Sequence, residues 1–197
     1  MAELPASVPR WNSHLGWLGD GVLRLAGWRM DIRFPDTPRF VIILAPHTSN
    51  WDFVYGLAAI LSLRVRVHFW AKHSLFRWPF GGLLRWAGGV AVERSSARGR
   101  VAETAARMRA ENSFILGLAP EGTRQRVEQW KTGFYQVALK AGVPIVPAYL
   151  DYRHKLVATG PVIHPTGDYA ADLKKLRTFY RTITPKRPEH YSRDDES

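Results

Sequence analysis

The sequence contains no cysteine, comparatively few acidic residues and no long hydrophobic run. Without cysteine, the 197 residues hold no disulfide, no thiol nucleophile and no Cys-ligated zinc. The longest apolar runs cover residues 40–46 and 53–63, far short of the ~20 residues that a membrane-spanning helix needs. The first residues (MAELPASVPRW) lack the basic segment and apolar core of a secretory signal. We therefore expect a cytoplasmic protein.

The charge balance is strongly basic. Lys and Arg number 28 against 17 Asp and Glu, a formal net charge of +11. Such a surface attracts polyanions, which include nucleic acids, anionic lipid headgroups and phosphorylated substrates. Hydrophobic residues make up 46% of the chain, the balance of an ordinary globular protein. The sign of the charge alone does not choose among these partners.

The order of the predicted elements indicates a single α/β domain over residues 1–197. Apolar residues at three- and four-residue steps predict an amphipathic helix within residues 10–30, ahead of a core at 40–150 and a polar tail at 184–197. Because strands and helices alternate, we expect a mostly parallel central sheet covered by helices. The predicted strands are 40–45, 65–70, 89–93, 113–119, 143–150 and two near 156 and 162, and the predicted helices are 11–30, 49–63, 98–110, 131–141 and 169–182, with short helices within 74–87.

In such sheets, ligands bind at the loops that follow the strands, and residues 46–52 (PHTSNWD) form one such loop. On one continuous helix His47 and Asp52 would point roughly 140° apart. They meet only if His47 lies in the strand-to-helix turn and Asp52 in the first helical turn, with Ser49 or Asn50 as N-cap. Asp52 could then hold the Nδ1 proton of His47 and leave Nε2 as a base. The alternative is a capping box formed by Ser49 and Asp52, with His47 a turn residue without a chemical role.

A second loop, residues 120–124 (PEGTR), also follows a predicted buried strand. Gly122 permits a close backbone approach, Thr123 adds a hydroxyl, and Arg124 can hold a phosphate through two hydrogen bonds. The alternative is a surface turn whose Glu121 and Arg124 are simply solvated.

In combination the two loops are more specific than either alone. Three further segments accompany them: residues 89–94 (GVAVER), 131–134 (KTGF) and 143–148 (VPIVPA). In order and spacing, these segments of residues 40–150 resemble the motifs of the glycerolipid acyltransferase family. The departures from the family pattern are Pro46, Ala119 and Gln125, which stand where Asn, Phe and Ser are usual, and they leave the acceptor open.

The resemblance implies an O-acyltransferase that moves a fatty acyl chain from acyl-CoA or acyl carrier protein to a hydroxyl of a lysophosphatidic-acid-type lipid. It implies His47 as general base and Asp52 as its orienting partner. Because the chain has no Cys and no Ser nucleophile of the family, and no His, Asp and Glu cluster with the spacing of zinc ligands, we expect no acyl-enzyme, no cofactor and no metal. The residues that the resemblance implies for binding the acceptor and its phosphate are Arg94, Glu121, Gly122, Thr123 and Arg124, with Lys72 as a further basic group.

Lipid substrates require a surface that meets a membrane, and we expect peripheral association with an anionic, cytoplasmic membrane face. Two segments are candidates, although aromatic and amphipathic stripes also pack into cores. The first is the face of Trp11, Leu15, Leu18, Val22 and Leu25, with Arg10, Arg24 and Arg29; the second is Trp70, Phe76, Trp78, Phe80 and Trp86, with Lys72, Arg77 and Arg85.

Three other functions remain as alternatives. A nucleic-acid-binding module would explain the charge, but the basic residues are spread along the chain and no nucleic-acid motif is present, so we expect no nucleic-acid partner. A lipid hydrolase on the same scaffold would use water in place of the lipid hydroxyl. An inactive lipid-binding relative would not need both His47 and Asp52.

Overall fold

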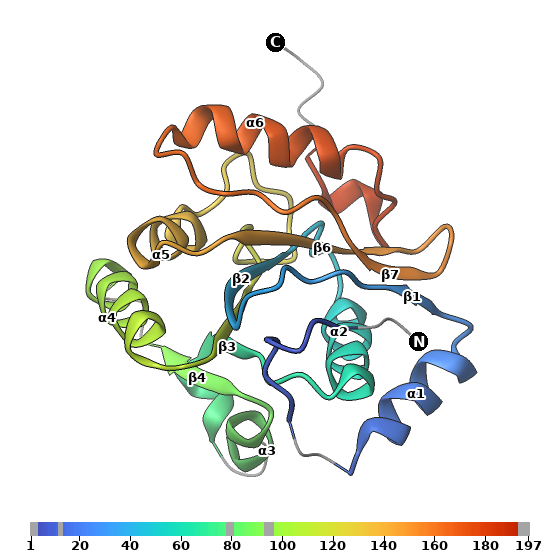
Figure 1. Cartoon of the computed structure of the whole chain (residues 1–197). Coiled ribbons are helices and arrows are strands. Elements are labelled where there is room, and N and C mark those ends of the chain that lie inside the picture. Colours follow the sequence, from blue (N-terminus) through green and yellow to red (C-terminus); the bar gives the residue numbers. More distant parts are fainter. Residues whose placement is uncertain (1–3, 12–13, 78–80, 93–96, 193–197) are drawn as a thin grey trace.

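A single sheet organises the computed structural model, which describes residues 4–11, 14–77, 81–92 and 97–192 (Figure 1). Within these residues seven strands pair in the order β1-β7-β6-β2-β5-β3-β4. Neighbouring strands are parallel except β6 and β7, so the expected mostly parallel sheet is confirmed. The strands are β1 (Arg29–Asp31), β2 (Arg39–Leu44), β3 (His68–Lys72), β4 (Gly89–Val92), β5 (Phe114–Leu118), β6 (Ile145–Asp151) and β7 (Leu156–Thr159).

Helices cover both faces of the sheet. Alternate side chains of β2 point to opposite faces, so Val41 belongs to one hydrophobic cluster and Phe40 to the other. The first cluster is covered by α4 (Ala97–Ala110), α5 (Gly133–Ala141) and α6 (Tyr169–Tyr180), and the second by α1 (Gly16–Leu25) and α2 (Asn50–Leu63). Shorter helices are η1 (His73–Phe76), α3 (Gly81–Trp86) and η3 (Pro188–His190).

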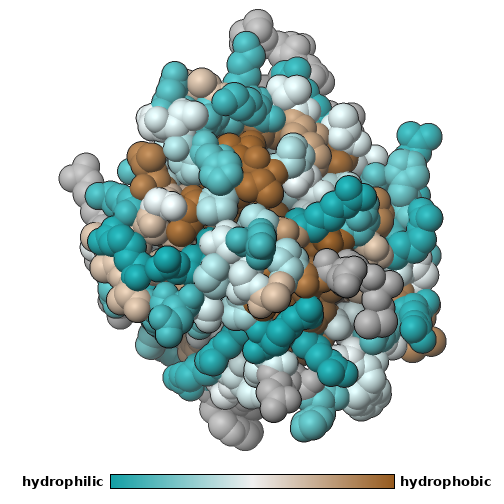
Figure 2. All heavy atoms as spheres, viewed as in Figure 1, coloured by the Kyte–Doolittle hydropathy of each residue, from teal (hydrophilic) through white to brown (hydrophobic). Residues whose placement is uncertain are grey.

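The longer helices pack apolar side chains against the sheet and turn their other sides to the solvent. Figure 2 shows one face, on which hydrophilic side chains stand out and apolar residues come to the surface in the gaps between them. Within the described residues, every helix is too short or too polar to cross a bilayer.

The structure corrects three of the predicted elements. The helix predicted over residues 11–30 is only Gly16–Leu25, and Met30 lies in β1, whose partner β7 is more than 120 residues away in the chain. Such a short strand, paired so far away, has little local signal. The strand predicted near residue 162 is a single bridge between Ile145 and Ile163, and the strand predicted from Val65 begins at His68.

Three adjacent strands bring their carboxyl ends to one edge. β2 is parallel to β5 on one side and to β6 on the other, with Ile43 opposite Leu118 and Leu44 opposite Ala148. The residues that follow these strands are therefore neighbours. This edge is where parallel α/β sheets bind ligands.

Candidate active site

The turn between β2 and α2 brings His47 and Asp52 together. Ser49 has the extended backbone of an N-cap, and its hydroxyl accepts a hydrogen bond from the amide of Trp51. Asp52 is the third helical residue and accepts the amide of Ser49 at 2.8 Å, which completes a capping box. In the same arrangement, His47 Nδ1 lies 3.3 Å from Asp52 Oδ2. The capping box and the His–Asp pair therefore coexist in this turn.

The His47–Asp52 contact is a close approach rather than an aligned hydrogen bond, because Nδ1 has no partner among the described residues that meets hydrogen-bond geometry. In enzymes without bound substrate such contacts are often long and tighten when the substrate binds. Since Nδ1 faces the carboxylate, Nε2 is the ring nitrogen left to take a proton from a ligand. The structure thus supplies the geometry on which a catalytic role for His47 depends.

Hydrogen bonds from three directions hold the Asp52 carboxylate, whose side chain is 1% exposed. Oδ2 accepts the amides of Thr48 and Ser49, each at 2.8 Å, and Oδ1 accepts the hydroxyl of Tyr152 at 2.6 Å. Burial acts to raise the pKa of Asp52, but the interactions with His47, Tyr152 and the backbone outweigh it and hold the pKa below its usual value. Asp52 is therefore an anion at neutral pH and can stabilise a protonated His47.

Tyr152 is a site residue that the sequence analysis missed. It directly follows β6, at the same edge of the sheet as His47. Burial and, to a smaller extent, the hydrogen bond to Asp52 raise the pKa of Tyr152 well above the usual range. The hydroxyl therefore stays protonated and donates to Asp52. The available signal was its place two residues beyond the predicted strand 143–150, which was expected to lie in the same mostly parallel sheet as the strand before His47.

Glu121 joins the two loops that carry the motifs. Its Oε2 accepts the backbone amide of His47 at 2.8 Å, and the residue is only 5% exposed. Its Oε1 has no hydrogen-bond partner among the described residues. Burial raises the pKa of Glu121 to about 7, against the opposing effect of the hydrogen bond from His47. The structure thus places Glu121 on the backbone of the His47 turn, while its predicted role in acceptor binding stays a prediction.

The rest of the loop is more open. Gly122 has φ +65°, and a Cβ there would lie 2.5 Å from Nζ of Lys131. Thr123 and Arg124 are exposed, and Arg124 makes no hydrogen bond or ion pair with the residues that the structure describes. This exposed guanidinium, in the loop that carries Glu121, is available to an anionic ligand.

The other two predicted basic residues are only partly placed. Lys72 is the last residue of β3, which is parallel to β5, so its backbone lies at the same edge of the sheet; its side chain is not described. Arg94 lies outside the described residues.

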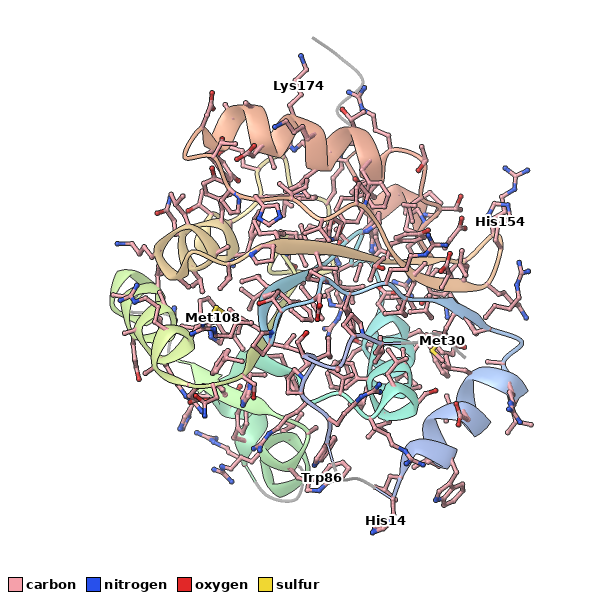
Figure 3. The ribbon with its side chains drawn as sticks, in the orientation of Figure 1. His14, Met30, Trp86, Met108, His154 and Lys174 are labelled. Atoms are coloured by element: carbon pink, nitrogen blue, oxygen red, sulfur yellow. The ribbon has the colours of Figure 1, made fainter. Side chains whose placement is uncertain are left out.

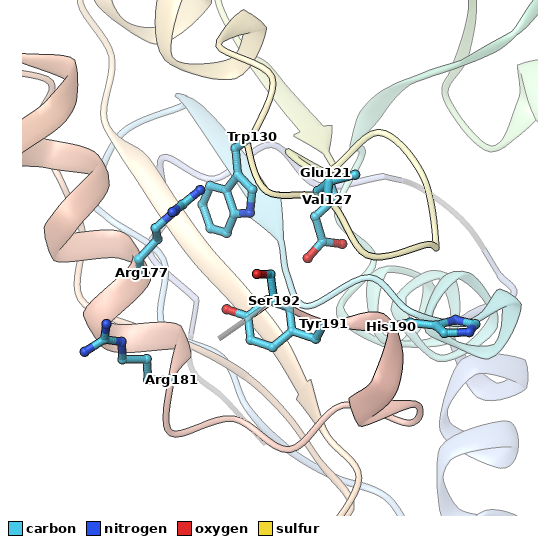
Figure 4. Close-up of a pocket in the computed structure, with 8 residues that line it drawn as sticks. All are labelled: Glu121, Val127, Trp130, Arg177, Arg181, His190, Tyr191 and Ser192. Atoms are coloured by element: carbon cyan, nitrogen blue, oxygen red, sulfur yellow. The ribbon is translucent and has the colours of Figure 1, made fainter. Parts of the chain in front are cut away.

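A pocket adjoins Glu121 and is also lined by Trp130 and Tyr191 (Figure 4). In the close-up the Glu121 carboxylate points into the space between Trp130 and Tyr191, and the Arg177 side chain extends from α6 toward Trp130. The segment expected to be a polar tail provides part of this wall, and its Pro185 and Tyr191 are buried. In the described residues, no three His, Asp or Glu side chains are grouped so that they could hold a metal ion.

The fold, the His–Asp turn and the PEGTR loop together define an acyltransferase-type domain. Residues 33–151 match the family model Acyltransferase, and the chain belongs to this family. By structure it is similar to the 1-acyl-sn-glycerophosphate (LPA) acyltransferase PlsC from Thermotoga maritima, with a TM-score of 0.59, 18% identity, and coverage of 87% of this chain and 80% of the other. That likeness confirms a single α/β domain of this fold.

Several curated relatives are named 1-acyl-sn-glycerol-3-phosphate acyltransferase. The Haemophilus influenzae protein is 30% identical over 160 residues, which are 76% of this chain and 62% of the relative. The Escherichia coli protein is 32% identical over 71% of this chain and 60% of its own length. The human beta form is 33% identical over 83% of this chain and 66% of its own. The chain thus spans about 60% of the length of the two bacterial relatives.

Proposed function

We propose that this chain is an O-acyltransferase that moves a fatty acyl group from a thioester to the hydroxyl of a 1-acylglycerol-3-phosphate-type lipid. The observation that carries the proposal is the His47–Asp52 pair, held at the carboxyl edge of the sheet and joined through Glu121 to the PEGTR loop. The names of the relatives support the same substrate class.

In the proposed mechanism, both substrates are bound when the acyl group moves. His47 Nε2 takes the proton of the acceptor hydroxyl. The hydroxyl oxygen attacks the thioester carbonyl carbon and forms the new C–O bond. The C–S bond then breaks, and the departing sulfur receives the proton from His47. The negative charge of Asp52 stabilises the imidazolium between these steps. Arg124, with Arg94 and Lys72, binds the phosphate of the acceptor.

Product analysis tests this proposal. The purified protein is incubated with acyl-labelled CoA or acyl carrier protein and a panel of lysolipids, and the labelled products are identified. We expect label in the diacyl phospholipid formed from a lysophosphatidic acid. Labelled free fatty acid alone, with that acceptor present, would favour the hydrolase. Failure to consume either thioester would contradict both enzymatic functions.

We also propose that the protein meets the membrane through exposed apolar residues of α1. The predicted α1 face is only partly free: Leu18 and Leu25 are exposed, while Leu15 and Val22 are half-buried. Trp17, which was not in the predicted set, is 68% exposed and Leu25 is 93% exposed. In the second predicted segment Phe76 is buried and Trp70 packs against the core, whereas Trp78 and Phe80 lie outside the described residues.

Replacing Trp17 and Leu25 together with Ser is expected to weaken binding to anionic vesicles by about tenfold or more, because each exposed apolar side chain gains roughly 1.5–3 kcal/mol when it leaves water. Co-sedimentation with liposomes measures the change. Leu139→Ser on α5 is a matched control, because Leu139 is also exposed but lies under the opposite face of the sheet. Wild-type protein that ignores anionic vesicles at low salt would contradict this docking surface.

A further inference from the structure

The segment of residues 184–187 crosses the edge of the candidate active site. The amide of Tyr152 donates to the carbonyl of Thr184 at 2.9 Å, and the amide of Arg187 donates to the hydroxyl of Thr48 at 3.2 Å. Thr48 directly follows His47 and is 1% exposed. The segment is therefore fixed to both sides of the site, through the residue after β6 and through the turn before α2.

This attachment sets Lys186 on an aromatic platform beside the Asp52 carboxylate. Its Nζ lies 4.8 Å from the ring centre of Trp51 and 5.8 Å from that of Tyr152, which are cation–π distances. The Tyr152 hydroxyl in turn donates to Asp52. One side chain therefore separates the Lys186 ammonium from the carboxylate that faces His47.

The segment carries two cations, Lys186 and Arg187. Lys186 and Arg187 are exposed, and neither forms an ion pair within the described part of the chain. Lys186 lies over Trp51, the second residue of α2, at the helix end whose dipole attracts anions. The segment fixed to the site thus carries two positive charges without an ion pair among the described residues, and one of them, Lys186, adjoins a helix N-terminus.

We propose that Lys186 and Arg187 form an anion-binding site for a phosphate group of one of the two substrates. The inference rests on the proposed acyltransferase function and extends it beyond residues 33–151, the part that matches the family model. Lys and Arg bind phosphate through charge-assisted hydrogen bonds, and Lys186 is already held in place by its platform. A phosphate could come from the headgroup of the acceptor or from coenzyme A in the donor.

The test is the double variant Lys186→Gln/Arg187→Gln, compared with Arg66→Gln/Lys174→Gln. The control removes the same two charges far from the site, since Arg66 precedes β3 at the amino end of the sheet and Lys174 projects from the outer side of α6 (Figure 3). Kinetics use lysophosphatidic acid or monoacylglycerol as acceptor, and acyl-CoA or acyl-pantetheine as donor. We expect KM for one phosphate-bearing substrate to rise about tenfold or more, with kcat little changed.

The arms of the experiment identify the source of the phosphate. A rise in KM for lysophosphatidic acid but not monoacylglycerol assigns the site to the acceptor; a rise for acyl-CoA but not acyl-pantetheine assigns it to the donor. Equal KM values in the two double variants, or a loss confined to vesicle binding, would overturn the proposal. Calorimetry measures the binding of coenzyme A and of lysophosphatidic acid without turnover. It therefore tests this site even if acyl transfer is absent.

Discussion

Replacing His47 with Ala is expected to lower kcat for acyl transfer by about 1000-fold, because the acceptor hydroxyl then loses the base that takes its proton. The helix start remains intact, since the capping box uses Ser49 and Asp52 and not the imidazole. Steady-state kinetics with a thioester and a lysolipid measure the loss, and circular dichroism with a thermal melt checks the fold. Activity within a few-fold of the wild type would end the assignment of His47 as the base.

Two substitutions in the hydrogen-bond network around Asp52 test the same mechanism, one by removing the charge and one by removing a single hydrogen bond. Asp52→Asn keeps an oxygen for the amides of Thr48 and Ser49 but removes the charge that stabilises protonated His47, so kcat is expected to fall strongly. Tyr152→Phe removes only the donor on Oδ1. Because this hydrogen bond lowers the pKa of Asp52, its loss raises that pKa, and the carboxylate also loses one of the three groups that hold it beside His47. We therefore expect a smaller fall in kcat than for Asp52→Asn, and a kcat equal to that of the wild type would mean that Tyr152 serves packing alone.

Asp52 also explains why the two interpretations of residues 46–52 could not be separated by sequence. A capping box needs only a local backbone geometry and is visible as Ser-x-x-Asp. The pairing with His47 depends on the turn that precedes the helix, and the same Oδ2 atom serves both. The cap that starts α2 is thus also what aims the carboxylate at the imidazole.

What the sequence predicted well was local. Strand β2, helix α2 and the two motif loops each have their own pattern of apolar, capping or turn residues, and they fall within a residue or two of their predicted places. What it missed depends on strand order. Tyr152 joins the site only because β6 lies beside β2, and Lys186 only because its segment is bonded to Tyr152 and Thr48. No spacing along the chain contains that information.

Glu121 has the largest predicted effect on stability. Its pKa is about 7 in the folded protein against 4.5 for a free Glu side chain, so between these pH values the folded state keeps a proton that the unfolded state has lost. The free energy of unfolding should therefore fall as pH rises through this window, by up to about 3 kcal/mol from this group. Glu121→Gln removes the titration and keeps an oxygen that can accept the His47 amide.

Urea unfolding of the wild type and Glu121→Gln from pH 4.5 to 8 measures this effect. The advantage of the variant is expected to grow with pH across the window and then level off. Glu128→Gln, which removes an exposed carboxylate from the same loop region, should not change the slope. A constant difference between Glu121→Gln and the wild type at all pH values would show that the carboxylate titrates normally.

Activity separates the two roles open to Glu121. If it positions the His47 turn by accepting the amide, Glu121→Gln retains most of kcat, while Glu121→Ala loses about tenfold or more because a buried N–H is left unpaired. If its charge binds the acceptor, as the family resemblance implies, both variants instead raise KM for the lysolipid to a similar extent. The hydrogen bond at 2.8 Å and the 5% exposure favour the positioning role. One oxygen of this buried carboxylate is already bound to the His47 amide, so only the other could contact a substrate.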